Sequence, residues 1–237
     1  MRLHRFFVEE NIPTEGEFSV VNETLLNQWR NVLRMEDGSN VILFSGDRSE
    51  SLCNFVSLTK KSAVVKVIER KQGLVPAREV TLYLALIKKD NFELVLEKAT
   101  ELGVSHIVPV QADRSEKKGV NYERAQKLLR EASEQSGRAM VPTIGEIVST
   151  AEILGSSDLP RNDGLVVFDP RGEISAREFF AKNTTTPVSV FIGPEGGFTD
   201  AEMELFHTRN VPIVSTGTQI LRAETAAIVA LTLALVK

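Results

Sequence analysis

Short apolar runs separated by polar turns dominate the first third of the chain. Their length and their content of β-branched and aromatic residues are typical of strands, and turns are indicated at residues 45–47 and 60–61. The predicted strands are Glu17 to Val21, Asn40 to Phe44, Leu52 to Leu58 and Ser62 to Ile68. We therefore predict a small, compact β-barrel at the N-terminus.

One helix interrupts these strands. Asn22 is a favourable N-cap, and apolar residues repeat at helical spacing from Leu25 through Trp29 to Leu33. Gly38 lies just past the end of this pattern, where a helix commonly stops. The N-terminal unit is thus expected to contain strands and a single helix.

The segment Arg70 to Arg78, RKQGLVPAR, separates two regions of different rhythm. It places Gly73 and Pro76 among charged residues, which is typical of a linker. We therefore predict an N-terminal domain over residues 1–72 and a second domain over residues 73–237.

Strands and helices alternate in the second region. The first strand is a nearly continuous apolar run, which is typical of a strand covered on both faces. The predicted strands are Val80 to Ile87, His106 to Val110, Leu165 to Phe168, Val188 to Ile192 and Val211 to Ser215. This order predicts an α/β domain with a mainly parallel sheet.

The helices between these strands carry clear end signals. Asp90 followed by Glu93 resembles a capping box, and Gly103 ends that helix; Thr199 and Glu202 repeat the signal. The remaining predicted helices are Asn121 to Ser136, Ala176 to Lys182 and a C-terminal helix from about Ala223.

Composition changes this picture little. Hydrophobic residues at 42% and charged residues at 25% of 237 are ordinary for a globular protein, and the single Cys53 is expected to be a buried strand residue. The N-terminus resembles no targeting segment, and Ala226 to Val236 is too short to cross a bilayer, so we expect a cytoplasmic location. The net charge of −4 requires any RNA-binding surface to be local.

Three loops follow strands of the predicted parallel sheet: FDPRG (Phe168 to Gly172), GPEGGF (Gly193 to Phe198) and TGTQILR (Thr216 to Arg222). Ligands collect beyond the carboxyl ends of such strands, and glycines let a ligand approach the main chain closely. In any one loop the glycines are explained by a tight turn alone. Three such loops together favour a site for an adenine or ribose.

Motifs of other enzymes with this architecture are missing. The chain has no G-x-G-x-x-G after the first strand of the second domain, no phosphate-binding G-x-x-x-x-G-K-[ST] and no G-x-S-x-G. His4, His106 and His207 are scattered without metal or triad spacing, so we expect no metal.

Several ordered motifs resemble one family, the bacterial 16S ribosomal RNA (uridine-N3)-methyltransferases of the SPOUT class. The motifs are HRFF near the N-terminus, NVLRM at Asn31 to Met35, KATELGV at Lys98 to Val104, EQSGR at Glu134 to Arg138, IGPEGGF and ILRAETA. The resemblance covers essentially the whole chain.

This resemblance implies a PUA-like N-terminal barrel that helps bind RNA, followed by a methyltransferase domain with a trefoil knot. It also implies a homodimer, with which the apolar C-terminal segment AAIVALTLALV is compatible. One position departs from the family: histidine usually stands a few residues before VLR, where this chain has Gln28 and Trp29. We interpret this change as a variation in packing.

S-adenosylmethionine is the cofactor that the resemblance implies, held mainly by backbone groups of the glycine-containing loops. The predicted cofactor-binding residues are Phe168, Ile192, Gly193, Pro194, Glu195, Gly196, Thr216, Gly217, Ile220, Leu221 and Arg222. Arg222 is the candidate to stabilise negative charge on the target, with an ion pair to Glu224 as the alternative. Glu195 or Glu224 is the candidate proton acceptor.

Clustered basic residues are the candidates for contacts with 16S ribosomal RNA or the small ribosomal subunit. They are Arg2, Arg5, Arg30, Arg34, Lys88 and Lys89. Two other functions remain open from the residues alone. One is an RNA-binding module without catalysis, and the other is methylation of a ribose hydroxyl, because ribose and base methylation make similar demands on the loops.

Overall fold

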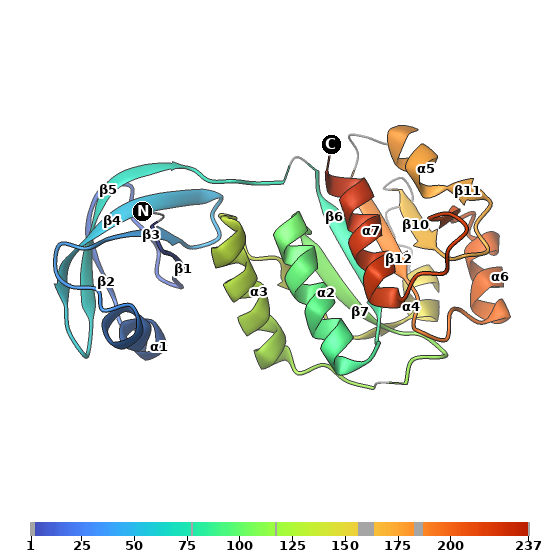
Figure 1. Ribbon diagram of the computed structural model, residues 1–237, viewed down its shortest axis with the longest axis horizontal. Helices are drawn as coiled ribbons and strands as arrows, with labels where there is room; N and C mark the ends of the chain where they lie inside the picture. The colour runs from blue at the N-terminus through green and yellow to red at the C-terminus, as the bar shows by residue number, and fades with distance from the viewer. Residues whose placement is uncertain (1–2, 77, 117, 156–163, 183–186, 237) are drawn as a thin grey trace. The chain divides into compact units, whose positions relative to one another are not determined.

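The computed structural model describes residues 3–76, 78–116, 118–155, 164–182 and 187–236 (Figure 1). The chain forms two compact units. The first comprises Met1–Val75 together with Ser133–Val141, and the second comprises Pro76–Ala132 and Pro142–Lys237. The segment Ser133–Val141 thus belongs with the N-terminal strands although it is distant from them in sequence.

A five-stranded sheet in the order β1-β3-β4-β5-β2 forms the first unit. Its strands are β1 (Arg5–Phe7), β2 (Gly16–Val20), β3 (Asn40–Phe44), β4 (Ser49–Leu58) and β5 (Ala63–Gln72). All four predicted strands are present, and the three-residue β1, which pairs in parallel with β3, was too short to predict. Because β5 continues to Gln72, the predicted linker begins inside a strand.

This sheet is open. In the part of the chain that the structure describes, β1 and β2 are the outer strands of the order and do not pair with each other. The expected closed barrel is therefore not formed. Strand lengths and turns are local properties, whereas closure requires pairing between segments that only the tertiary fold brings together.

The helix of the first unit begins as predicted and ends differently. The side chain of Asn22 accepts a hydrogen bond from the Leu25 backbone N–H at 3.1 Å and caps α1 (Glu23–Asn27). A π-helical turn, η1 (Gln28–Val32), follows directly. The chain leaves the helix at Arg34, which has a φ of 53°, so Gly38 does not end it.

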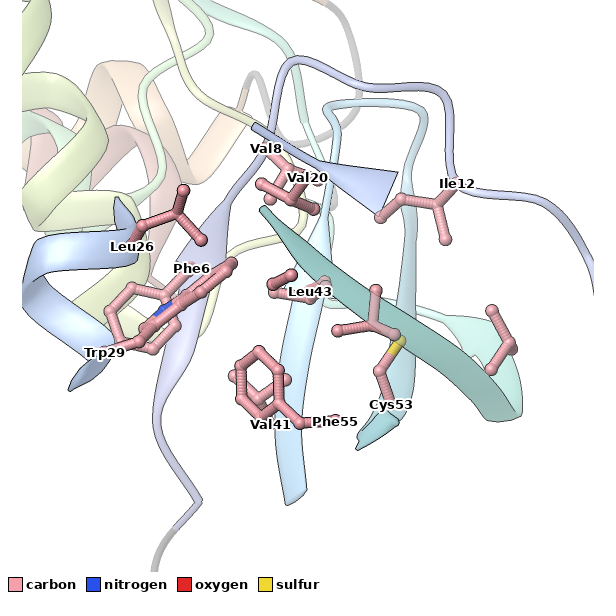
Figure 2. Close-up of a cluster of buried hydrophobic side chains, with 13 residues drawn as sticks. Phe6, Val8, Ile12, Val20, Leu26, Trp29, Val41, Leu43, Cys53 and Phe55 are labelled. Atoms are coloured by element: carbon pink, nitrogen blue, oxygen red, sulfur yellow. The ribbon is translucent and has the colours of Figure 1, made fainter. Parts of the chain in front are cut away.

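Trp29 belongs to the hydrophobic core of the first unit, and Figure 2 shows it beside Phe6. Its fully buried ring contacts Phe6 and Phe55 edge to face, with centroids 5.6 and 5.1 Å away. The interpretation of Trp29 as a packing residue is confirmed. Cys53 is buried in the same cluster, as expected, and its burial raises the pKa of the thiol to about 11.

Polar contacts attach Ser133–Val141 to the N-terminal strands. Glu134 accepts a hydrogen bond from the Phe7 backbone N–H at 3.0 Å, and the Arg138 carbonyl accepts one from Arg5 at 3.3 Å. Arg5 also pairs with Glu50 at 2.5 Å, where both side chains are about nine-tenths buried. The EQSGR motif therefore contributes to the structure of this unit.

The second unit contains an eight-stranded sheet whose paired strands are all parallel, and this confirms the predicted α/β class. The order is β11-β13-β10-β12-β6-β7-β8, with β9 beside β7. The strands are β6 (Val80–Ala85), β7 (His106–Gln111), β8 (Thr143–Ile144), β9 (Val148–Ser149), β10 (Leu165–Phe168), β11 (Ile174–Ser175), β12 (Val188–Ile192) and β13 (Ile213–Ser215).

Helices cover both faces of this sheet. They are α2 (Lys89–Leu102), α3 (Tyr122–Ser136), α4 (Thr150–Gly155), α5 (Ala176–Lys182), α6 (Asp200–Thr208) and α7 (Ala223–Leu235). Figure 1 shows α2 and α7 side by side on one face, where α7 contacts α2, β6 and β12. On the other face, residues of α4 and α6 pack with Phe191 and Phe198.

The helix ends predicted at Thr199 and Gly103 are observed in this unit, but the start of α2 differs from the prediction. Thr199 and Glu202 form the predicted capping box of α6, and Gly103 ends α2 with a φ of 111°. However, the N-cap of α2 is Lys88, without a side-chain hydrogen bond, and Asp90 lies inside the first turn. The prediction of Asp90 as the N-cap is wrong. The backbone N–H of Lys88 instead donates a hydrogen bond to the side chain of Glu195, which belongs to a distant loop.

Candidate cofactor site

The three glycine-containing loops meet at one edge of the parallel sheet. The strands before them, β10, β12 and β13, are neighbours, so their carboxyl ends lie together. A cavity of about 490 Å³ opens there. Its walls are formed by Lys88, Asn91, Phe168, Asp169, Pro170, Ile192, Gly193, Pro194, Glu195, Gly197, Phe198, Val214, Thr216, Gly217, Gln219, Ile220, Leu221, Arg222, Ala223, Glu224 and Ala226.

Every predicted cofactor-binding residue except Gly196 lines this cavity. The cavity also includes residues that the sequence did not single out, among them Asn91 and Asp169. Asp169 could have been found, because it lies in the FDPRG loop. Asn91 could not, because it belongs to α2, and only the fold brings α2 to this edge.

Gly196 faces away from the cavity and toward Arg114. A Cβ on Gly196 would lie only 3.2 Å from the Cβ of Arg114, and its carbonyl accepts a hydrogen bond from Arg114 Nη1 at 2.9 Å. The backbone of Gly196 thus lies close to the side chain of Arg114, in the segment after β7. Gly196 is exposed beside the cavity lining, and its predicted contact with the cofactor stays a prediction.

Gly217 requires glycine for a different reason. Its φ of +126° lies in a region that other residues rarely adopt, and no atom lies within 4 Å of a Cβ built on it. The main chain of the TGTQILR loop therefore turns at Gly217 with no side chain between it and the cavity.

Arg171 connects two of the three loops. Its guanidinium binds both carboxylate oxygens of Asp169, at 2.8 and 3.0 Å, and donates to the Phe198 carbonyl at 3.1 Å. The hydrogen bond to Asp169 raises the pKa of Arg171. The buried carboxylate of Asp169 is thereby neutralised by a bidentate partner within its own loop.

Glu195 connects the GPEGGF loop to α2. Its Oε1 accepts a hydrogen bond from the Lys88 backbone N–H at 3.0 Å, although the residue is otherwise exposed. This contact takes the place of a side-chain cap at the start of α2.

Glu202 fixes the C-terminal end of the GPEGGF loop through hydrogen bonds. It is 3% exposed, and its Oε1 accepts from Thr150 Oγ1 at 2.8 Å and from the Asp113 N–H at 3.2 Å. Its Oε2 accepts from the Thr199 N–H at 2.9 Å. One carboxylate thus fastens the segments after β7, β9 and β12 to one another.

Arg222 and Glu224 lie at the start of α7 and both line the cavity. Arg222 is exposed, whereas Glu224 is 9% exposed and its Oε2 has no hydrogen-bond partner in the described residues. The alternative ion pair between Arg222 and Glu224 is not formed in this structure. Both residues therefore lie in the cavity lining without an ion pair to each other.

The described residues contain no cluster of potential metal ligands. No three side chains of the His, Cys, Asp or Glu type gather there as a metal site would require. His106 is hydrogen bonded to Thr143 and Glu79, at 2.7 and 2.9 Å. Within the same ranges, no helix is long and apolar enough for a membrane span.

Comparison with known proteins gives the family. Residues 75–235 match the model of an RNA methyltransferase domain. The ribosomal RNA small subunit methyltransferase E of Bacillus subtilis is 33% identical over 248 residues, covering 97% of this chain and 94% of the relative. This chain belongs to that methyltransferase family. The family member of Rickettsia conorii is 28% identical over 235 residues, covering 98% and 94% of the two chains.

A solved structure of the same family has the same fold throughout. The enzyme from Neisseria gonorrhoeae, crystallised with S-adenosylmethionine, superimposes with a TM-score of 0.89 at 25% identity, over 98% of this chain and 96% of that one. The family predicted from the sequence motifs is thus confirmed.

Proposed function

We propose that this chain transfers a methyl group from S-adenosylmethionine to N3 of a specific uridine in 16S ribosomal RNA. The observation that carries the proposal is the single cavity built by the three glycine-containing loops in a member of this methyltransferase family. The crystallised relative from Neisseria gonorrhoeae binds the same methyl donor. The choice of uridine N3 rests on the ordered motifs of the whole chain.

The cavity fits this cofactor in size and chemistry. About 490 Å³ is within the range of pockets that enclose small cofactors. Phe168, Ile192 and Leu221 supply apolar walls for an adenine ring, while exposed main chain at Thr216 and Gly217 supplies hydrogen-bonding groups. The cavity lining also includes the largely buried carboxylate of Glu224, whose Oε2 has no hydrogen-bond partner in the described residues.

S-adenosylmethionine, when bound, supplies an electrophilic methyl group on a sulfonium. The chain must position the target base and accommodate the proton that leaves N3. Exposed Arg222 stabilises negative charge on the uracil oxygens or holds the target phosphate. Glu195 and Glu224 are the carboxylates at the cavity that are suited to accept the proton.

Basic residues on each unit are proposed to contact RNA phosphates. Arg34 is exposed and Arg30 half-buried in the first unit, and Lys88 and Lys89 are exposed at the start of α2. Arg5 is left out of this set, because Glu50 and the Arg138 carbonyl already engage its guanidinium. Arg2 lies outside the described residues.

We further propose a PUA-like RNA-binding role for residues 1–72, a knotted catalytic domain over residues 73–237 and a homodimer without metal. The support for a dimer is apolar surface near the cavity: Ile220 is 83% exposed, and Ile228, Val229 and Leu233 of α7 are only half-buried. A ribosomal RNA substrate also implies a cytoplasmic location. Light scattering of the purified protein tests the dimer.

Nucleoside mass spectrometry tests the proposed reaction. Unmodified 16S ribosomal RNA and assembled small subunits are incubated with the protein and methyl-labelled S-adenosylmethionine, and we expect label in 3-methyluridine. Label in a 2′-O-methylated nucleoside would instead support ribose methylation. RNA binding without any label would support a non-catalytic module.

Salt dependence tests the RNA contacts. We expect affinity for 16S ribosomal RNA to fall steeply with added salt, and a Lys88→Ala variant to reduce the slope of that dependence. The matched control is Lys118→Ala, an exposed lysine outside the proposed set. An unchanged slope in the Lys88 variant would remove Lys88 from the set.

A further inference from the structure

Glu224 is a largely buried residue in the lining of the cavity, and its carboxylate forms no ion pair in the described residues. It occupies the first turn of α7, lines the cavity and is 9% exposed. Its Oε2 is fully covered and accepts no hydrogen bond from the described part of the chain. Buried carboxylate oxygens are normally satisfied, so this atom indicates a missing donor.

The other acidic side chains at the cavity do not have this property. Asp169 is neutralised by the bidentate contact with Arg171, and Glu195 accepts the Lys88 N–H. Arg222 and Lys88 also line the cavity, yet neither forms an ion pair with Glu224 in the described structure. Within the described residues, the carboxylate of Glu224 therefore has no cationic partner.

Glu224 lies in the first turn of α7. Partial positive charge at the N-terminus of the 13-residue α7 stabilises an anion in the first turn. A cationic donor is the strongest hydrogen-bond partner of a carboxyl group, because it satisfies the oxygen and compensates the negative charge at the same time.

We propose that Glu224 binds the α-ammonium group of the methionine portion of the methyl donor. This inference rests on the proposed function, because it assumes that the cavity holds S-adenosylmethionine. Arg222 and Lys88 then remain available for anionic groups, namely the carboxylate of the same methionine portion and the RNA. Glu195, the more exposed carboxylate, is left as the acceptor of the N3 proton.

Calorimetry with three ligands tests this assignment. S-adenosylmethionine and S-adenosylhomocysteine both contain the ammonium group, whereas 5′-methylthioadenosine contains the nucleoside and sulfur without it. We expect Glu224→Gln to weaken binding of the first two at least about tenfold, and to leave the affinity for 5′-methylthioadenosine unchanged. Glu224→Asp, which retains the charge, should recover part of the loss.

A matched control makes the same change in the first turn of another helix. Glu123 is exposed in the first turn of α3 and lies outside the cavity, so Glu123→Gln should leave all three affinities unchanged. Thermal unfolding of the ligand-free variants serves as a second readout. A cofactor-binding role predicts no loss of melting temperature in Glu224→Gln relative to this control, whereas a structural role predicts a marked loss.

Other results would overturn the assignment. Equal weakening of all three ligands would place the contact on the nucleoside. Unchanged affinities combined with a slower single-turnover rate would place it on the uridine, and unchanged affinities combined with a change of oligomeric state would assign it to a second copy of the chain. If the unaltered protein binds none of the three ligands, the proposed function itself fails.

Discussion

The two units each bury a glutamate to the same degree, but they surround it differently. Glu50 in the first unit and Glu224 in the second are both 9% exposed. Glu50 lies between Arg5 at 2.5 Å and Lys71 at 3.3 Å, whereas Glu224 has neither an ion pair nor a donor to Oε2 in the described residues. Burial alone therefore does not distinguish a structural carboxylate from a ligand-binding one.

Glu202 shows that this difference is not simply one between the two units. It is more buried than Glu224 and belongs to the same unit, yet it accepts hydrogen bonds from Thr150, Asp113 and Thr199. What separates Glu224 from both other glutamates is its position on the cavity wall. The carboxylates of Glu50 and Glu202 are satisfied by the fold, whereas that of Glu224 keeps an unpartnered oxygen in the lining of the cavity.

The largest expected effect is on stability when Glu50 is removed. Glu50→Ala leaves the mostly buried guanidinium of Arg5 without its carboxylate, which should lower the free energy of unfolding by about 3 kcal/mol. Trp29, the only tryptophan, reports unfolding of the first unit by fluorescence in urea. Affinity for S-adenosylmethionine should not change, and the exposed Glu17→Ala should leave both measurements unchanged.

Removing Glu202 should affect both stability and binding. Glu202→Ala eliminates the capping box of α6 and leaves the Thr150 hydroxyl without its acceptor, so we expect a loss of about 2 kcal/mol in thermal unfolding followed by circular dichroism. Affinity for S-adenosylmethionine should also fall, because the GPEGGF loop precedes the cap. If Glu204→Ala on the exposed face of α6 has the same effects, the role assigned to Glu202 is wrong.

A smaller change is expected from strain in the cavity loop. Gly217→Val places a β-branched residue at a φ of +126°, which costs about 1–2 kcal/mol and should lower affinity for S-adenosylmethionine about tenfold. The urea midpoint reported by Trp29 should not move. Gly119→Val provides the control, because that exposed glycine has no positive φ and open space around it.

The smallest effect concerns Cys53 in the first unit. Burial raises the pKa of its thiol from 9.0 to about 11, so the neutral thiol is favoured in the folded chain. Its contribution to stability is complete below pH 9 and is lost as the pH rises toward 11. The stability difference between the unaltered protein and Cys53→Ala should shrink over that range. Rapid alkylation of native Cys53 at pH 8 would contradict its burial.

Local sequence signals predicted much of the second unit correctly. The strands Val188–Ile192 and Leu165–Phe168 have the bounds expected from their apolar runs. The capping box of α6 is formed by Thr199 and Glu202, which are only three residues apart. Because parallel strands end at one edge of a sheet, the three loops could also be grouped before any coordinates. Two-residue strands such as β8 and β11 leave no periodic pattern and were missed.

Long-range contacts account for the errors. Asp90 is an adequate local cap, but Glu195 binds the Lys88 N–H from another loop and shifts the start of α2. The N-terminal strands form an open sheet because β1 and β2 do not pair in the described structure.

The sequence by itself determined the family, the alternation of strands and helices and the loops that form the cavity, because these depend on short-range periodicity and on contiguous motifs. Only the tertiary structure decided which side chains of those loops face the cavity, and which of the buried glutamates lacks a partner. Residues that are distant in the chain determine whether a buried carboxylate has hydrogen-bond and ion-pair partners. Its partners therefore cannot be inferred from its own sequence context.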